Sequence, residues 1–176
     1  DDRPVELILV ATDESAGQTD EAAGFLAGHD ADVRIIRANT GKLFDDGLRT
    51  DSRLPLATYV RLRLDHLLGR EFEKVLYLDA DTRVMAPLAP LFQTEFGDRP
   101  LAAVKDIYMY VQDRLAAANG LLGSPPDTDY FNSGVMLMNW PMVLKEQVLS
   151  RALDYALRYP ERCRSCDQDA LNAIIA

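Results

Sequence analysis

A short apolar run that ends on two aspartates constrains this chain most. Residues 75–84 read Val-Leu-Tyr-Leu-Asp-Ala-Asp-Thr-Arg-Val. This pattern predicts a buried β-strand with Asp79 and Asp81 just beyond its C-terminal end, where open α/β sheets bind their ligands. Two carboxylates there suit Mg²⁺ or Mn²⁺, which usually share their coordination with a substrate phosphate. The alternative is that one aspartate caps a turn and the other is solvated.

Further apolar runs alternate with helical patterns along the chain. We expect strands at residues 5–11, 33–38, 75–78, 101–104 and 134–140. We expect helices at 19–28, 55–69, 141–159 and 167–176, a turn or short helix at 87–92, and a helical or mixed segment at 107–123. This alternation predicts an α/β fold with a largely parallel sheet. The 176 residues fit one domain, 1–176.

Composition excludes several classes of function. Hydrophobic residues make up 48% and charged residues 27% of the chain, which predicts an ordered core. The net charge of -9 and the lack of a basic run disfavour nucleic acid as a partner. No apolar stretch is long enough to span a bilayer, and residues 1–4 do not resemble a secretory signal, so we expect a cytoplasmic protein.

The two cysteines, Cys163 and Cys166, form a Cys-x-x-Cys pair after residues 159–162, which we expect to be a loop. A zinc site needs further ligands, and His29 and His66 are far away in the sequence. A redox pair would follow a strand and open a helix. We therefore interpret these residues as two loop thiols without a metal or redox role.

Four motifs in a fixed order carry a resemblance to a known family. They are Thr-Tyr-Val-Arg-Leu at 58–62, Leu-Tyr-Leu-Asp-Ala-Asp at 76–81, Tyr-Phe-Asn-Ser-Gly-Val at 130–135 and Asp-Gln-Asp-Ala-Leu-Asn at 167–172. Together they resemble glycosyltransferase family 8, which includes glycogenin and bacterial lipopolysaccharide galactosyl- and glucosyltransferases. The resemblance covers nearly the whole chain. It implies a GT-A fold, with a Rossmann-like sheet and a nucleotide pocket at the strand ends.

The resemblance implies a retaining transfer of galactose or glucose from a UDP-sugar to a glycan, lipopolysaccharide-type or other hydroxyl acceptor. It makes Asp79 and Asp81 the ligands of Mn²⁺ or Mg²⁺, a Lewis acid that neutralises the departing diphosphate. Asp79 and Ala80 also belong to the implied donor-binding set. Arg61 is implied to face the donor sugar, and the match of the motif at 58–62 favours this role over the alternative, an ion pair with Asp65 on a helix surface.

Further donor contacts are implied after two strands. Asp106 follows a strand end and either accepts hydrogen bonds from sugar hydroxyls or only ends the strand. Asn132, Ser133 and Gly134 resemble a loop that lines the sugar pocket, where asparagine donates and accepts and glycine permits a close approach. Their alternative is a plain turn before a strand.

The last motif supplies the implied catalytic pair. Asp167 is implied to hold sugar hydroxyls and Gln168 to lie beneath the anomeric carbon. An amide is a poor nucleophile, so a front-side route with an oxocarbenium-like transition state is expected. A simple helix N-cap is the alternative for this motif, and Asp169 is expected to fix the helix start. We interpret the remaining large side chains as core residues rather than a sugar platform: Met136, Met138, Trp140, Met142, Tyr155 and Tyr159.

Two parts of the family pattern are absent, its first strand and a C-terminal histidine–lysine segment. The chain also begins without methionine and ends within an apolar pattern at 170–176, so we expect a fragment whose exposed strand edges favour self-association. Two alternative functions remain. One is a haloacid-dehalogenase-like phosphatase with Asp79 as nucleophile, although Arg83 stands where that family prefers threonine or valine. The other is a non-catalytic binding module.

Overall fold

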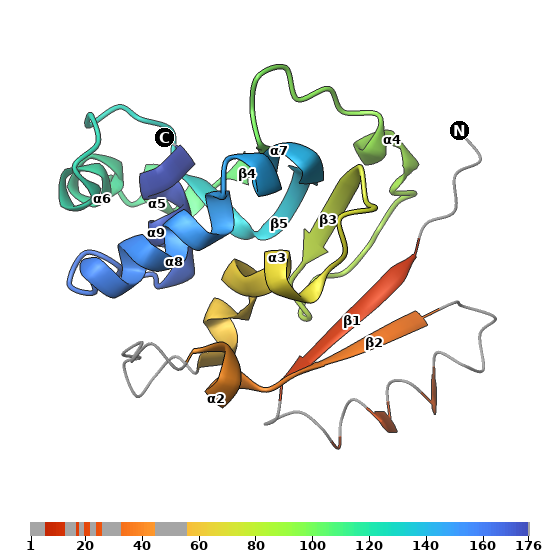
Figure 1. Ribbon diagram of the computed structural model, residues 1–176. Helices are drawn as coiled ribbons and strands as arrows, with labels where there is room; N and C mark the ends of the chain where they lie inside the picture. The colour runs from red at the N-terminus through yellow and green to blue at the C-terminus, as the bar shows by residue number, and fades with distance from the viewer. Residues whose placement is uncertain are drawn as a thin grey trace. The chain divides into compact units, whose positions relative to one another are not determined.

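The computed structural model describes residues 6–12, 17, 20–21, 24–25, 33–44 and 56–175 (Figure 1). Its backbone divides into two compact units, Asp1–Val60 and Arg61–Ala176. Most of the helix predicted at 19–28 lies outside the described residues, and residues 20–21 and 24–25 are helical. The prediction of a single domain stays a prediction.

The first unit contains a parallel strand pair. β1 (Leu7–Thr12) and β2 (Val33–Ala38) pair in register from Leu7 opposite Val33 to Thr12 opposite Ala38. Their aliphatic and β-branched residues suit a pleated, half-buried surface, and both strands were predicted. Asn39 then caps α2 (Thr40–Leu43), because its side-chain oxygen accepts the N–H of Lys42 at 2.8 Å.

The second unit contains a three-stranded sheet of β3 (Lys74–Leu78), β4 (Leu101–Lys105) and β5 (Phe131–Asn139). The order is β3-β5-β4, and both pairs are antiparallel. The α/β class is therefore as predicted, but the largely parallel sheet is not. Within the described strands, parallel pairing is confined to β1 and β2, because β5 enters between β3 and β4 in the opposite direction.

Helices make up much of the rest of residues 56–175. They are the 3₁₀ helix η2 (Leu56–Arg63), α3 (Leu64–Leu67), α4 (Ala89–Phe92), α5 (Ile107–Val111), α6 (Leu115–Leu122), α7 (Trp140–Lys145), α8 (Val148–Arg158) and α9 (Asp167–Ile175). The single helix predicted at 141–159 is interrupted, because Gln147 adopts a left-handed conformation with φ of 53°. Among the described helices, none is long and apolar enough to cross a lipid bilayer.

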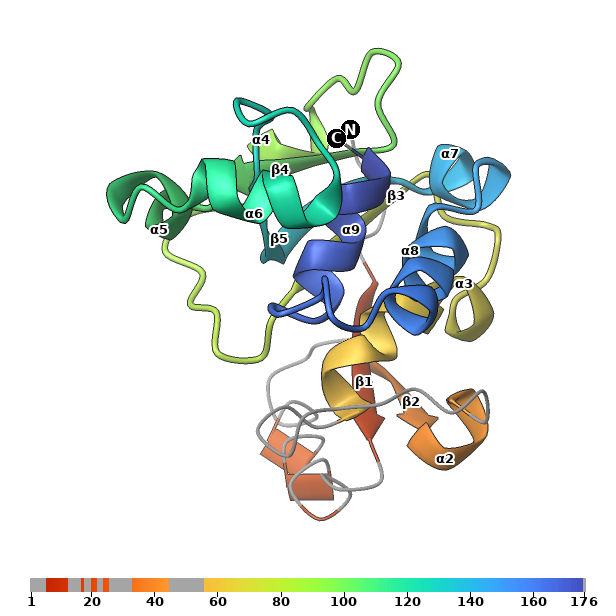
Figure 2. The same ribbon diagram turned by 90° about the vertical axis from the view of Figure 1, so that its left-hand side faces the viewer.

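One face of the antiparallel sheet forms the core of the second unit. Met136 and Met138 are fully buried, α9 packs against β5, and α8 lies beside α9 in both views (Figures 1 and 2). Helix α8 buries residues at helical spacing: Leu149, Ala152, Leu153 and Ala156. Trp140 is also fully buried, and its Nε1 donates to the carbonyl of Gly69 at 2.8 Å. These methionines and Trp140 are core residues, as predicted.

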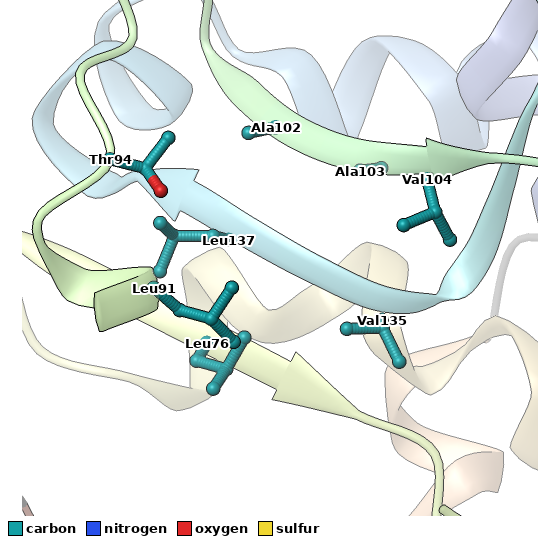
Figure 3. Close-up of a pocket in the computed structure, with 8 residues that line it drawn as sticks. All are labelled: Leu76, Leu91, Thr94, Ala102, Ala103, Val104, Val135 and Leu137. Atoms are coloured by element: carbon teal, nitrogen blue, oxygen red, sulfur yellow. The ribbon is translucent and has the colours of Figure 1, made fainter. Parts of the chain in front are cut away.

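A small apolar pocket of about 150 Å³ lies between the strands of this sheet and α4 (Figure 3). Its lining residues are Leu76, Leu91, Thr94, Ala102, Ala103, Val104, Val135 and Leu137. Thr94 is the only polar residue of this lining, and no residue predicted to bind donor or metal belongs to it. The pocket is therefore separate from the polar cluster described next.

Candidate active site

Arg61 is the centre of a polar cluster in the second unit. Its Nη2 lies 2.9 Å from Asp79 Oδ1, and its Nε lies 3.0 Å from Asp167 Oδ2. Its Nη1 donates to the carbonyl of Ser133 at 2.8 Å and to the hydroxyl of Ser133 at 3.2 Å. The side chain is only 10% exposed. Arg61 belongs to the first of the four sequence motifs, and its guanidinium therefore contacts one residue from each of the other three.

The alternative for Arg61, an ion pair with Asp65 on a helix surface, is wrong. Asp65 instead accepts a hydrogen bond from the hydroxyl of Ser150 at 2.7 Å and lies 3.9 Å from His66 Nε2. Arg61 points away from it because η2 is a 3₁₀ helix, whose three-residue turn does not stack positions four residues apart on one face.

Asp79 directly follows β3 and is held from two sides. Its N–H donates to the carbonyl of Gly134 at 2.8 Å, and its Oδ1 accepts the hydroxyl of Tyr77 at 2.8 Å. The Arg61 guanidinium also lies 4.7 Å from the centre of the Tyr77 ring. Burial raises the pKa of Tyr77, so its hydroxyl remains a donor. Tyr77 was not predicted as a site residue, because from the sequence it resembles any other residue of a buried apolar strand.

Ala80 and Asp81 lie in the exposed turn after Asp79. Because Arg61 and Tyr77 both contact Oδ1 of Asp79, its Oδ2 and the Asp81 carboxylate remain for a cation. No group of three or more His, Cys, Asp or Glu side chains could hold a metal within the part of the chain that the structure describes. Two carboxylates fit a hard cation that takes its other ligands from phosphate and water.

The predicted loop at Asn132, Ser133 and Gly134 is instead part of β5. The strand starts one residue earlier, with Phe131 opposite Lys105, and the ladder continues into the bond between Asp79 and Gly134. These three residues therefore extend the sheet where a turn was expected. A Cβ at Gly134 would lie 2.7 Å from Asp79 Oδ2, so glycine makes room for the Asp79 carboxylate, while its close approach to the donor stays a prediction.

Asp167 begins α9 and is almost completely buried. The Ser133 hydroxyl donates to its Oδ2 at 3.2 Å. Burial raises the pKa of Asp167 to about 6, although the Arg61 charge and the Ser133 hydrogen bond act in the opposite direction. A carboxylate with this pKa is ionised at neutral pH and protonated in mild acid.

Gln168 connects β5 to the start of α5. Its Oε1 accepts the N–H of Ser133 at 3.0 Å, and its Nε2 donates to Asp106 Oδ2 at 2.8 Å. Asp106 also caps α5, since its Oδ1 accepts the N–H of Tyr108 at 3.0 Å. Asp106 therefore directly follows β4 and also lies in the cluster, while its contact with sugar hydroxyls stays a prediction.

The sequence analysis missed two further members of this network, Tyr130 and Asn172. The hydroxyl of Tyr130 donates to Asp169 Oδ1 at 2.6 Å. Asn172 bonds both the N–H and the carbonyl of Phe131 at 2.9 Å and so connects α9 to β5. The sequence signal that could have identified Asn172 was a polar residue among the apolar residues of the predicted helix, one turn after Gln168. Asp169 fixes the helix start, as predicted, because its Oδ2 accepts the N–H of Ser165.

Cys163 and Cys166 lie in the turn before α9, and both side chains are buried without forming a disulfide. Burial raises the pKa of the Cys163 thiol to about 12. A thiol with this pKa is protonated at neutral pH and is a poor nucleophile or metal ligand. The turn location of both residues agrees with the predicted loop, and the lack of a metal or redox role stays a prediction.

Comparison with solved structures defines the class of protein. The galactosyltransferase LgtC, solved in complex with donor and acceptor sugar analogs, is similar with a TM-score of 0.76 and 25% identity, over 97% of this chain and 70% of that one. The bifunctional glycosyltransferase WbbM, in its apo form, is similar with a TM-score of 0.73 and 20% identity, over 99% of this chain and 38% of that one. The predicted GT-A fold is confirmed.

Residues 27–176 match Glycosyl transferase family 8, and the chain belongs to this family. It is 30% identical to a putative glycosyltransferase of Haemophilus influenzae, over 74% of this chain and 38% of that protein. It is 29% identical to a lipopolysaccharide 1,3-galactosyltransferase of Salmonella typhimurium, over 68% of this chain and 36% of that protein. The chain thus spans about two fifths of the length of these relatives. This membership removes the support for the phosphatase alternative.

Proposed function

We propose that this protein is a metal-dependent retaining glycosyltransferase that moves a hexose from a UDP-sugar to a hydroxyl group of a glycan or lipopolysaccharide-type acceptor. The observation that carries the proposal is the Arg61 contact with Asp79, Ser133 and Asp167, which brings the four motifs into one cluster. Galactose and glucose are the favoured sugars, because relatives are named as lipopolysaccharide galactosyl- and glucosyltransferases.

In this proposal Asp79 and Asp81 would hold Mn²⁺ or Mg²⁺ through carboxylate oxygens, and the cation would supply positive charge beside the diphosphate leaving group. Arg61 keeps Asp79 in place through the contact at 2.9 Å. Tyr77 donates to the same carboxylate oxygen at 2.8 Å, so the other oxygen keeps its lone pairs for the cation.

Three side chains are proposed to orient the sugar. Asp106 and Asp167 accept hydrogen bonds from its hydroxyl groups, since each carboxylate keeps acceptor positions beyond its protein contacts. The Oδ1 of Asn132 accepts the N–H of Gly134 at 2.9 Å, which leaves its amide hydrogens to donate to a hydroxyl group. Such directed contacts hold the reacting carbon in a defined geometry.

Gln168 is proposed to act on the developing charge of the transferred sugar. Its Nε2 is bonded to Asp106, and its Oε1 accepts the N–H of Ser133 at 3.0 Å. The Ser133 hydroxyl lies 3.5 Å from the same Oε1, but its single proton is given to Asp167 at the shorter distance of 3.2 Å, so one lone pair of the amide oxygen remains. An amide oxygen carries partial negative charge and stabilises a positively charged, oxocarbenium-like sugar without forming a bond to it. This favours front-side transfer over a double displacement through Gln168.

The test is the release of UDP from a panel of UDP-sugars by the full-length protein in the presence of Mn²⁺. Asp79→Asn and Asp81→Asn each remove one proposed ligand, and turnover should fall by about 100-fold or more. Asp127→Asn, an exposed aspartate in the turn after α6, is the matched control and should retain turnover. Unchanged turnover in both ligand variants would refute the metal assignment. A wild-type protein that consumes none of these donors would support the binding-module alternative.

A further inference from the structure

Tyr130 connects several groups of the cluster although it lies outside the contacts proposed for the sugar. Its side chain is fully buried, and its hydroxyl donates to Asp169 Oδ1 at 2.6 Å. The Nε2 of Gln168 donates to the Tyr130 oxygen at 3.4 Å. The backbone carbonyl of Tyr130 accepts the N–H of Asp106 at 2.9 Å. This one residue therefore contacts both acidic neighbours of Gln168 and Gln168 itself.

Only one assignment of donors and acceptors satisfies all the hydrogen bonds of this network. A phenol has a single proton, and that of Tyr130 is given to the carboxylate of Asp169. The Tyr130 oxygen can then only accept, so it must face the amide nitrogen of Gln168. The two hydrogens of this nitrogen are directed to Asp106 and Tyr130, while the amide oxygen faces the N–H of Ser133.

The opposite orientation of the Gln168 amide is excluded by the same groups. It would place the amide oxygen against the carboxylate of Asp106 and the amide nitrogen against the N–H of Ser133. Tyr130 could donate to the turned oxygen only by leaving Asp169 without its partner. Burying a carboxylate oxygen without a hydrogen-bond partner is unfavourable, which opposes this rearrangement.

We propose that Tyr130 is a positioning residue: by giving its proton to Asp169 and accepting from Gln168, it acts together with Asp106 and Ser133 to hold the Gln168 amide in the orientation that it presents to the transferred sugar. This inference rests on the proposed function of Gln168. It assigns Tyr130 no contact with the substrate. Its effect on transfer passes through Gln168, and this makes it separable from a general effect on folding.

A double-mutant cycle on the full-length protein tests this coupling. Tyr130→Phe keeps the buried ring and removes the hydroxyl, and we expect kcat to fall about tenfold while KM for the UDP-sugar changes less than about twofold. In a Gln168→Ala background the same substitution should change kcat less than about twofold. Tyr155→Phe loses the hydroxyl bond to the carbonyl of Leu122 and should leave kcat unchanged.

Two outcomes of the cycle would overturn the proposal. One is an unchanged kcat for Tyr130→Phe, and the other is the same loss in both backgrounds, which would indicate a structural role. A wild-type protein without UDP release would instead refute the proposed function. Asp169→Asn is the second variant, because it also weakens the acceptor of the Tyr130 proton. It should lower kcat in the wild-type background and not in Gln168→Ala.

A spectroscopic measurement tests the positioning without turnover. The side-chain amide signals of Gln168 are assigned in a ¹⁵N–¹H spectrum by their loss in Gln168→Ala. We expect Tyr130→Phe to shift one of the two hydrogens, because it loses the acceptor at 3.4 Å, and to leave the one bonded to Asp106 nearly unchanged. Two unshifted hydrogens would show that Tyr130 does not orient this amide.

Discussion

The guanidinium of Arg61 lies between two carboxylates, 2.9 Å from Asp79 and 3.0 Å from Asp167. The contact with Asp79 runs from Nη2, while the Nε contact with Asp167 is an ion contact without hydrogen-bond alignment. Asp79 directly follows β3 and Asp167 begins α9, and these two elements are far apart in the sequence. Their mutual repulsion is offset by the single positive charge between them, so the site depends on Arg61 for its geometry.

Substitution of Arg61 should therefore affect stability more than a surface arginine does. Arg61→Met leaves two carboxylates without their counter-charge, and we expect the free energy of unfolding in urea to fall by about 3–5 kcal/mol. Arg61→Lys keeps the charge and loses the planar fork, so about 1–3 kcal/mol is expected. Arg99→Lys, on an exposed side chain, should change it by less than about 0.5 kcal/mol. Equal values for Arg61→Met and Arg99→Lys would contradict this prediction.

Asp167 should make stability depend on pH. The folded protein holds its proton up to about pH 6, whereas the unfolded chain releases it near the ordinary value of 3.8. The folded state thus binds more protons between these values, and its free energy of unfolding decreases as the pH rises from about 4 to 6. The full difference is roughly 3 kcal/mol for a shift of about two pH units.

An asparagine at position 167 does not titrate, so the Asp167→Asn variant should not show the decrease in the free energy of unfolding between pH 4 and 6. Urea unfolding of both proteins at several pH values between 4 and 7 measures the difference. The free energy of the variant relative to the wild type should become more favourable as the pH rises to 6 and stay constant above it. Parallel pH profiles would show that Asp167 keeps an ordinary pKa in the folded protein.

The sequence predicted the ends of elements better than the contacts between them. Asp79, Asp106 and Asp167 follow strands or begin a helix, and a strand end or cap can be read from local residues. Tyr130 and Tyr77 could not be identified, because an aromatic residue beside an apolar run is usually a core residue. The hydroxyl bond of Tyr130 to Asp169 joins residues 39 positions apart and arises only when α9 packs beside β5. The bond of Tyr77 to Asp79 is local, but apolar periodicity does not show that a tyrosine hydroxyl turns toward an aspartate two residues later.

The direction of β5 in the sheet could not be predicted from the sequence either. Alternation of strands and helices predicts parallel crossovers, but β5 lies antiparallel between β3 and β4. Its direction depends on where the segment between β4 and β5 leads the chain, which apolar periodicity does not encode. Asn132 and Ser133 were placed in a loop for a related reason. Polar residues at the start of a strand resemble turn residues until the pairing partner is known.

Gly134→Ala should disturb Asp79 with little effect on the fold. The added Cβ would lie 2.7 Å from Asp79 Oδ2 and 3.0 Å from Asn132 Oδ1, so the carboxylate must move. We expect donor turnover to fall by about tenfold or more, with a loss of stability of about 1–2 kcal/mol. Gly120→Ala in α6 meets nothing within 4 Å and should not lower turnover or stability. A Gly134→Ala enzyme with wild-type turnover would show that Asp79 tolerates displacement.

Gln168→Glu should place two carboxylates in contact. The new oxygen would replace Nε2, which lies 2.8 Å from Asp106 Oδ2, so the pair is stable only while it shares a proton. The folded variant therefore keeps a proton that the unfolded chain releases near pH 4. Its stability relative to the wild type should decrease as the pH rises from 5 to 8, by about 1–3 kcal/mol in urea unfolding.

The double variant Asp106→Asn, Gln168→Glu is the matched control, because it exchanges the carboxylate and the amide between these two positions. The amide of residue 106 can then donate to the carboxylate of residue 168, so the repulsion at the 2.8 Å contact is replaced by a hydrogen bond. Most of the stability lost at pH 8 should return, and the extra pH dependence should disappear. If the single variant is destabilised equally at pH 5 and pH 8, the contact between Gln168 and Asp106 is not maintained in solution.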